Sequence, residues 1–201
     1  MKEQIIFATG NEGKLREIRL ILADLGRKIV TMRQAGFDGE IEETGTTFAE
    51  NATIKARTVW EKTGGIVMAD DSGLVIDYLN GEPGVYSARY LEEEPYEVKN
   101  RVLIDRMKGA VGKERSARFV CHITTVLPDG SELHADAAME GRIAEKPAGD
   151  GGFGYDPILY LPEYGMTSAE ISMEEKNRIS HRGKALRALV ELLRKNDEAD
   201  R

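Results

Sequence analysis

Short apolar runs that end directly at polar, glycine-bearing clusters are the feature that most constrains the fold of this chain. Four such clusters lie far apart in the sequence, at Thr9–Lys14, Ala69–Gly73, Gly151–Pro157 and Ser180–Gly183. The first follows an apolar run at 4–8 and opens a helical pattern. A strand that ends at a glycine-bearing loop and continues into a helix is typical of α/β domains.

The first half of the sequence alternates strand-like and helix-like patterns. The spacing of apolar residues predicts, in order, a strand at 4–8, a helix that ends at Gly26, a strand at 29–32 and a helix at about 46–62. A further apolar run at 66–69 leads into Asp70 and Asp71, and residues 74–78 then alternate as a strand does. We therefore expect the two aspartates at a strand end or in a sharp turn.

The second half predicts a helix, a hairpin and two closing helices. The expected elements are a helix at 95–108, two strands that flank a turn at 128–130, further strand sequence at 135–143, a short helix capped by Ser172 and a last amphipathic helix with Leu186 and Leu193 on its apolar face. The hairpin implies antiparallel pairing beside the earlier strand–helix units. The fold prediction is a single α/β domain, residues 1–201, on a mixed β-sheet, with 195–201 as a frayed tail.

Composition limits the partners of this chain. Its 201 residues, 41% of them hydrophobic, suffice for one domain with a core. The single cysteine, Cys121, excludes an intramolecular disulfide and is expected to be a buried thiol. No long apolar stretch opens the chain, so we expect a cytoplasmic protein without a membrane partner. A formal charge of −7 argues against nucleic-acid binding, so an anionic ligand would need placed cations and a bound metal.

Two features offer positive charge to an anionic ligand. In Thr9–Lys14 the backbone amides and the helix dipole face any anion at the start of the helix. An exposed dipole contributes only about 0.3 to 1 kcal/mol, so Lys14 must add its charge. The segment is not a Walker A loop, because Leu15 stands where Ser or Thr would hold magnesium. Asn51 and Lys55 share a helix face, where Lys55 reaches a phosphate or is simply solvated.

Besides these positively charged groups, the sequence contains carboxylates that could bind a metal. Asp70 and Asp71 followed by Ser-Gly resemble a turn when taken alone, but Glu42 and Glu43 precede the second predicted helix. Three or four converging carboxylates need a cation to neutralise them. Oxygen ligands of this kind suit Mg²⁺, with Mn²⁺ as a substitute.

The remaining clusters supply an aromatic ring and further donors. Three glycines surround Phe153, which is either a platform for stacking a base or a plug in the core. Ser180–Gly183, preceded by Lys176 and Arg178, either donates to keto oxygens and phosphates or is a helix junction with solvated charges.

Seven motifs in chain order carry a resemblance to a known family. They are TGNEGK, EETGTTFAENA, ADDSGL, PGVYSARY, GGFGYDP, EEK and SHRG. Each is weak alone, but together they resemble the inosine and xanthosine triphosphate pyrophosphatases over essentially the whole chain. The resemblance implies an elongated α/β fold with a central cleft, a homodimer, and hydrolysis of dITP, ITP and XTP to monophosphate and pyrophosphate, which keeps these nucleotides out of DNA and RNA.

The resemblance also implies residue roles. Phosphate binding falls on Thr9, Gly10, Asn11, Glu12, Gly13 and Lys14. Magnesium falls on Glu42 and Asp71, and Asp71 is also the proton acceptor. Further substrate-binding positions are Ser72, Phe153, Gly154, Tyr155, Asp156, Lys176, His181 and Arg182, with Lys55 and Arg89 as additional phosphate contacts.

The chemistry of these groups agrees with such a reaction, and two alternatives stay open. Arg182 or His181 would donate to the C6 oxygen of inosine, and against the amino group of adenosine each would lose about 1 to 3 kcal/mol. The alternatives are a pyrophosphatase for pyrimidine or modified nucleotides and a nucleotide sensor without turnover. The acids favour hydrolysis, because a pure anion binder gains nothing from them, and the missing Walker motif disfavours a phosphotransferase.

Overall fold

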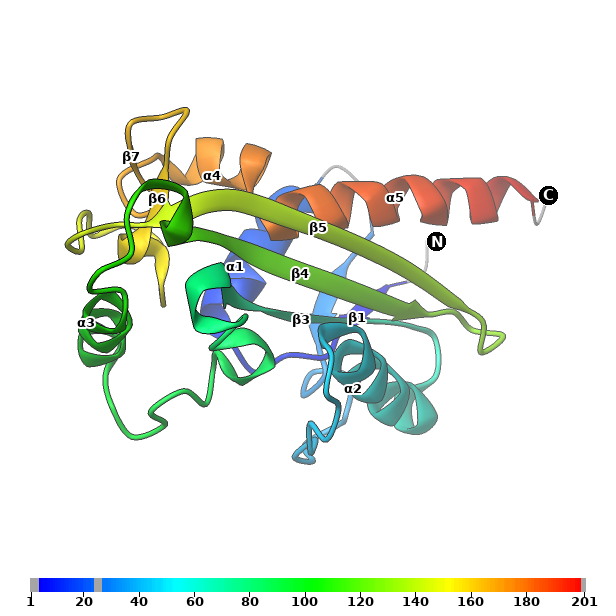
Figure 1. The fold of residues 1–201 in the computed structure, drawn as a ribbon. Coiled ribbons are helices and arrows are strands. Elements are labelled where there is room, and N and C mark those ends of the chain that lie inside the picture. The colour runs from blue at the N-terminus through cyan, green and yellow to red at the C-terminus, as the bar shows by residue number, and fades with distance from the viewer. Residues whose placement is uncertain (1–3, 24–26, 200–201) are drawn as a thin grey trace. The chain divides into compact units, whose positions relative to one another are not determined.

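Seven strands form one mixed sheet in the computed structural model, which describes residues 4–23 and 27–199. The strand order is β2-β1-β3-β4-β5-β6-β7 (Figure 1). The strands are β1 Ile5–Phe7, β2 Ile29–Thr31, β3 Ile66–Ile76, β4 Ser116–Val126, β5 Glu132–Ile143, β6 Leu159–Leu161 and β7 Met166–Thr167. β1 pairs in parallel with β2 and β3, whereas β6 pairs antiparallel with β5 and β7. The predicted α/β class and the mixed sheet are confirmed.

The α-helices of the described residues follow the sequence patterns closely. They are α1 Glu12–Ile21, α2 Phe48–Thr63, α3 Tyr96–Arg106, α4 Met173–Ile179 and α5 His181–Ala199. At the start of α2, Thr47 and Glu50 cap each other's backbone N–H groups. Ser172 caps α4, as predicted, by accepting the N–H of Glu175 at 3.1 Å. None of the helices in the described ranges is long and apolar enough to cross a membrane.

The chain forms two compact units, and each has its own core. The first consists of the residues up to Asp71, Cys121–Ala137 and the chain from Arg182 onward; the second consists of Ser72–Val120 and Ala138–His181. Three strands, β3, β4 and β5, run from one unit into the other.

In the first unit, helices cover both faces of the sheet. Ile66 and Met68 of β3 belong to the core that α1 and α5 cover, whereas Val67 and Ala69 belong to the core against α2. Figure 1 shows α2 on the opposite side of β1 and β3 from α5. Cys121 is fully buried in the first of these cores, where burial raises the pKa of its thiol to about 12. The expectation of a core thiol is confirmed.

The aspartates of β3 correct one sequence prediction. β3 continues from Ile66 to Ile76 and contains both Asp70 and Asp71, so the expected strand end or turn is wrong. The apolar pattern stops at Ala69 because cations take over as packing partners, not because the strand stops. Since successive side chains of a strand point to opposite faces, Asp70 lies on the face of α1 and α5, and Asp71 on the face of α2.

Other differences concern short elements and ends. The turn at 128–130 is confirmed, with the N–H of Leu127 donating to the carbonyl of Ser131 at 2.9 Å, but the strand after it is a single element, β5. β6 and β7 are too short to leave a sequence pattern and were not predicted. The predicted helix end at Gly26 lies outside the described residues, and α5 stays helical through Ala199, beyond residue 195 where fraying was expected.

The second unit packs α3 and the chain around β6 against its part of the sheet. Leu74 and Ile76 of β3 share a core with Leu103 of α3 and with Ile158 and Leu159, and all five side chains are fully buried. This core supports the loop at 151–156, which Pro157 joins to Ile158.

A matched pair of leucines on α1 tests the packing of the first unit. Leu15 is 2% exposed and Leu20 is 54% exposed, on the same helix. We expect Leu15→Ala to lower the free energy of unfolding by about 2 to 5 kcal/mol, because it leaves a cavity. Leu20→Ala should change it by less than about 0.5 kcal/mol. Urea unfolding of both variants measures the difference, and equal losses would contradict the packing described here.

Candidate functional site

Asp70 of β3 is paired with two cations that come from two helices. Its Oδ2 lies 3.0 Å from the ammonium of Lys14 in α1 and 3.2 Å from Nε of Arg182 in α5. Nη1 of Arg182 in turn donates to the carboxylate of Glu17 in α1. We call Lys14, Glu17, Asp70 and Arg182 the Asp70 cluster. It is nearly excluded from solvent and carries two positive and two negative charges, so it joins α1, β3 and α5 without net charge.

Electrostatics keeps Asp70 ionised. Burial would by itself raise the pKa of its carboxyl, but the charges of Lys14 and Arg182 outweigh burial and hold the pKa far below its usual range. Burial also opposes the charge of Arg182, yet Asp70 and Glu17 raise the pKa of the guanidinium. Asp70 is therefore a permanent counter-ion and is unsuited to accept a proton near neutral pH.

Asp71, one residue further along β3, has different partners on α2. Its Oδ1 accepts from the ammonium of Lys55 at 3.1 Å, and its Oδ2 accepts a longer bond from the amide of Asn51 at 3.4 Å. Lys55 also lies 2.8 Å from the carboxylate of Glu43. The N–H of Gly45 donates to Oδ1 of Asn51 at 2.8 Å, and a Cβ on Gly45 would lie only 2.6 Å from that atom. The predicted shared face of Asn51 and Lys55 is thus confirmed, and it faces Asp71.

The two neighbouring aspartates are shifted in opposite directions. Burial raises the pKa of Asp71, Lys55 and Lys14 oppose this effect, and the charge of Glu43 adds to it. A carboxylate with a raised pKa holds a proton more readily, which is what a general base requires. Pairs of acids whose surroundings separate their pKa values often divide two roles in a reaction. Asp71 is the candidate base, and Asp70 is its fixed neighbour.

The carboxylates do not converge as the sequence suggested. Asp70 lies on the other face of β3, and the side chain of Glu42 is exposed. Over residues 4–23 and 27–199 the structure places no three acidic, histidine or cysteine side chains where they would hold a metal. Asp71 and Glu43, however, both contact the ammonium of Lys55, so two carboxylates lie close to each other here. Carboxylate oxygens are ligands that suit Mg²⁺ or Mn²⁺.

Local hydrogen bonds shape the turn that opens α1. The hydroxyl of Thr9 accepts the N–H of Asn11 at 3.1 Å, and Oδ1 of Asn11 accepts the N–H of Lys14 at 3.1 Å. Asn11 is therefore the N-cap of α1. These bonds are those of a capped turn, and phosphate binding here stays a prediction. The side chain of Glu12 lies outside the described part of the structure.

In the second unit, Asp156 fixes the loop that carries Phe153. Its Oδ2 accepts the N–H of Phe153 and the ammonium of Lys176, both at 2.7 Å, and its Oδ1 accepts the hydroxyl of Ser168 at 2.8 Å. A Cβ on Gly152 would lie 2.1 Å from Oδ2 of Asp156, so only glycine fits there. The ring of Phe153 lies 5.0 Å from the ammonium of Lys176 and is 37% exposed. A ring this exposed does not plug a core.

Tyr155 connects this loop with the segment before Arg89. Tyr155 is buried, and its hydroxyl donates to the carbonyl of Ser87 at 2.7 Å. Burial raises the pKa of Tyr155, so the hydroxyl keeps its proton. Arg89 is exposed two residues after Ser87. His181 is buried, and its imidazole stacks on Phe119 with ring centroids 5.1 Å apart.

The predicted site residues divide between the two units. The first unit holds Thr9–Lys14, Glu42, Lys55, Asp71 and Arg182; the second holds Ser72, Arg89, Phe153–Asp156, Lys176 and His181. In the first, Lys55 meets Asp71, and Lys14 meets Arg182 through Asp70. In the second, Phe153, Asp156 and Lys176 meet.

Sequence reasoning missed several partners of these residues, and two of them show why. Glu17, the partner of Arg182, is three positions after Lys14 and shares its helix face, which was the available signal. Ser168, the partner of Asp156, gave no signal, because only the fold brings residues on either side of β6 and β7 together.

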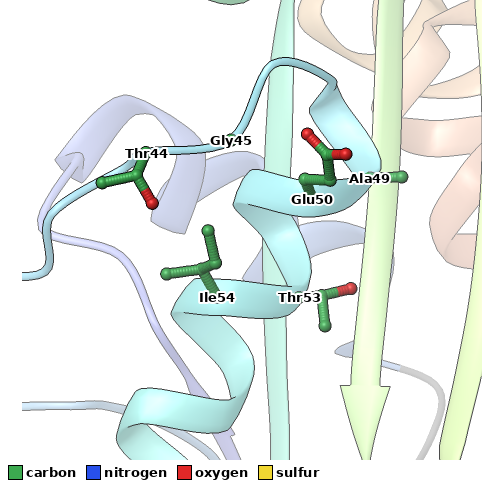
Figure 2. A pocket seen from close by; sticks show the side chains of 6 residues that line it. All are labelled: Thr44, Gly45, Ala49, Glu50, Thr53 and Ile54. Atoms are coloured by element: carbon green, nitrogen blue, oxygen red, sulfur yellow. The ribbon is translucent and has the colours of Figure 1, made fainter.

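A pocket near the start of α2 contains none of the predicted site residues. It has a volume of about 530 Å³ and is open to solvent. Figure 2 shows the side chains that line it. Glu50, one of its lining residues, is already bonded to the N–H of Thr46 at 2.6 Å as part of the helix cap. The lining residues are Thr44, Gly45, Ala49, Glu50, Thr53 and Ile54. The pocket therefore offers no free charged group to a nucleotide.

Removing the charge of Asp70 should destabilise the protein. The pKa of Asp70 is lowered in the folded state, so its contribution is present above about pH 4, the unfolded-state value, and is lost as the pH falls. We expect Asp70→Asn to cost about 3 to 5 kcal/mol at pH 7, because it leaves buried cations uncompensated. The loss should shrink toward pH 2. Asp38→Asn, in an exposed pair with Arg33, is the control and should change little. Urea unfolding of both variants from pH 2 to pH 7 measures these losses of unfolding free energy. A loss in Asp70→Asn that does not depend on pH would contradict the assignment of Asp70 as an ionised counter-ion.

Comparison with known proteins places this geometry in a family. The sequence model of the Ham1 family matches residues 5–192. The chain is 47% identical over 194 residues to the dITP/XTP pyrophosphatase of Bacillus licheniformis, covering 96% of this chain and 98% of that protein. It is 49% identical over 188 residues to the dITP/XTP pyrophosphatase of Thermus thermophilus, covering 94% and 90%. A solved HAM1 protein from Coxiella burnetii has a TM-score of 0.88 and 41% identity, covering 97% of this chain and all of that one.

These matches run through nearly the whole sequence and include the segments that carry Lys14, Lys55, Asp71 and the 153–156 loop. The chain belongs to the Ham1 family.

Proposed function

We propose that this protein hydrolyses deaminated purine nucleoside triphosphates, namely dITP, ITP and XTP, to the monophosphate and pyrophosphate. The observation that carries the proposal is Asp71, a buried carboxylate with a raised pKa, in contact with Lys55. Relatives of nearly the same length are named dITP/XTP pyrophosphatases, which supports the substrate class. Such an enzyme removes these nucleotides before they enter DNA or RNA.

The first unit supplies the groups for the phosphate chemistry. Asp71 accepts the proton of the water that attacks the α-phosphorus. Lys55 holds the carboxylate of Asp71 in place. Lys14, at the start of α1, is paired with Asp70 but is 15% exposed, and we propose its ammonium as the cation beside the helix N-terminus. Positive charge fixed near the phosphate oxygens offsets the negative charge that grows on them during the reaction.

Magnesium, with manganese as a substitute, is the cofactor we propose. Asp71 and Glu42 would hold it, and the two carboxylates of Asp71 and Glu43 that meet at Lys55 support a cation at this place. When bound, the ion neutralises phosphate charge and lowers the pKa of water.

For the second unit we propose binding of the base. The exposed ring of Phe153, held by Asp156 and flanked by Lys176, offers a face for stacking. Ser72 and Arg89 add polar contacts to the substrate. We assign the donor to the C6 oxygen first to His181, because the guanidinium of Arg182 already binds Asp70 and Glu17.

We further propose that the protein acts as a homodimer in the cytoplasm. The resemblance of the seven sequence motifs to nucleotide pyrophosphatases supports the dimer. The proposed substrates belong to the pool of free nucleotides, which supports the location.

Product identity tests the proposed reaction. With ITP and Mg²⁺ we expect inosine monophosphate and pyrophosphate in equal amounts, a slower reaction with ATP, and loss of activity when the metal is chelated. Chromatography of the products, with separate assays of pyrophosphate and orthophosphate, provides the measurement. Inosine diphosphate with orthophosphate as first products would refute the proposal.

Substitution of Asp71 separates its role from that of Asp70. We expect Asp71→Asn to lower kcat by at least the roughly 10²- to 10⁴-fold of general-base catalysis. At pH 7 the thermal midpoint of this variant should equal or exceed that of the unmodified protein. Burial disfavours the charged form of Asp71, and Glu43 still pairs with Lys55 when Asp71 is replaced. Steady-state rates at saturating Mg²⁺ and a thermal melt suffice. A near-normal kcat would show that Asp71 is only structural.

A further inference from the structure

Asn100 of α3 is a buried polar residue that the proposed reaction does not use. It is 3% exposed, and its Nδ2 donates to the carbonyl of Gly154 at 3.1 Å. Among the described residues its Oδ1, also buried, has no hydrogen-bond partner. A buried acceptor without a partner is unfavourable. The hydrogen bond to Gly154 is therefore the favourable interaction that this buried side chain makes.

Its neighbour Lys99 holds a second carbonyl. Lys99 is also 3% exposed, and its ammonium lies 3.4 Å from the carbonyl of Ala88 and 4.9 Å from the ring centroid of Tyr96. No carboxylate of the described chain pairs with it. A buried ammonium that relies on a carbonyl and an aromatic ring fixes the backbone to which it is bonded.

The two carbonyls belong to the two segments that carry proposed substrate residues. Gly154 follows Phe153, and Ala88 precedes Arg89. The backbone of Gly154 also lies against Tyr96, since a Cβ placed there would be 3.6 Å from that ring. The start of α3 therefore contacts both segments.

The Phe153–Gly154 dipeptide is held at both of its ends. Asp156 accepts the N–H of Phe153, and Asn100 donates to the carbonyl of Gly154. Between these ends the N–H of Asp156 donates to the carbonyl of Phe153 at 3.3 Å. Gly152 and Gly154 have φ angles of +70° and +69°, so the loop alone restricts its backbone little, and bonds such as these orient the ring of Phe153.

We propose that Asn100 is a positioning residue that holds the 153–156 loop in the conformation that presents Phe153 to the base. The expected effect of Asn100 on KM rests on the proposed function. The contact that links Asn100 to the loop rests on the geometry alone. Asn100 acts through the loop and does not itself touch the nucleotide.

Two measurements on Asn100→Ala test the proposal. Hydrogen exchange of a peptide covering 153–156 should become faster, because the loop loses an anchor. KM for ITP should rise by about 2- to 10-fold, the effect of one buried hydrogen bond, while kcat changes little because Asp71 and Lys55 are untouched. Asn100→Leu, which preserves volume and removes the donor, repeats the test if the alanine variant folds poorly.

Two controls, one on α3 and one at its C-cap, separate positioning from general destabilisation. Arg101→Ala removes a neighbouring side chain that is 68% exposed and should change neither quantity. Met107→Ala removes a fully buried side chain and should lower the melting temperature, yet leave KM and the exchange of the loop unchanged below that temperature.

A double-mutant cycle with Phe153→Ala tests the route of the effect. If Asn100 acts through the ring of Phe153, Asn100→Ala should change KM little when Phe153 is already alanine. The same fold-change in both backgrounds, or faster exchange with an unchanged KM, would overturn the positioning role. Absence of pyrophosphate release by the unmodified protein would refute the proposed function instead, whereas unchanged exchange in Asn100→Ala would refute this link alone.

Discussion

The pairing of Asp70 with Lys14 and Arg182 is the interaction on which the first unit depends. It joins a strand to two helices that are far apart in the sequence. Buried charges are costly unless they are paired, so each member of the cluster helps to fix the position of the others. Lys14, at the start of α1, thus has its place set by electrostatics as well as by the capped turn before it.

This fixed cluster gives Asp71 its distinct environment. The cluster satisfies Asp70 on one face of β3, while on the other face Asp71 is buried near a second acid and a shared lysine. The same side chain type is therefore a permanent anion at one position and the candidate proton acceptor of the proposed reaction at the next. Surroundings, not residue identity, divide the two roles.

The sequence predicted the parts of this structure that depend on local patterns. α2 and α4 have capping residues and regular spacing, and both were placed well. The length of β3 was predicted wrongly. An apolar run followed by two aspartates has the same sequence pattern in both cases: when the strand ends there, and when the strand continues and the aspartates pair with buried cations. β7, with two residues, is too short for any pattern.

The long-range partners of the candidate site residues were harder to predict than local contacts. The motifs named Asp71, Lys55 and Phe153 as candidates, whose roles stay predictions, and the shared face of Asn51 and Lys55 followed from their spacing. The bond between Glu17 and Arg182 joins residues 165 positions apart, and the one between Asn100 and Gly154 joins residues 54 apart. Such contacts are set by the sheet order, which helix and strand periodicity does not contain.

The adjacency of Asp70 and Asp71 on one strand constrains how this sequence can change over time. Loops accept insertions readily, and a shift of two residues along a strand restores each side chain to its own face. A single-residue insertion between the start of β3 and Ala69 would exchange the faces of the two acids, placing Asp71, the candidate proton acceptor, among the cations and Asp70 beside Lys55. Homologous chains should therefore vary in length around this strand and not within its first half.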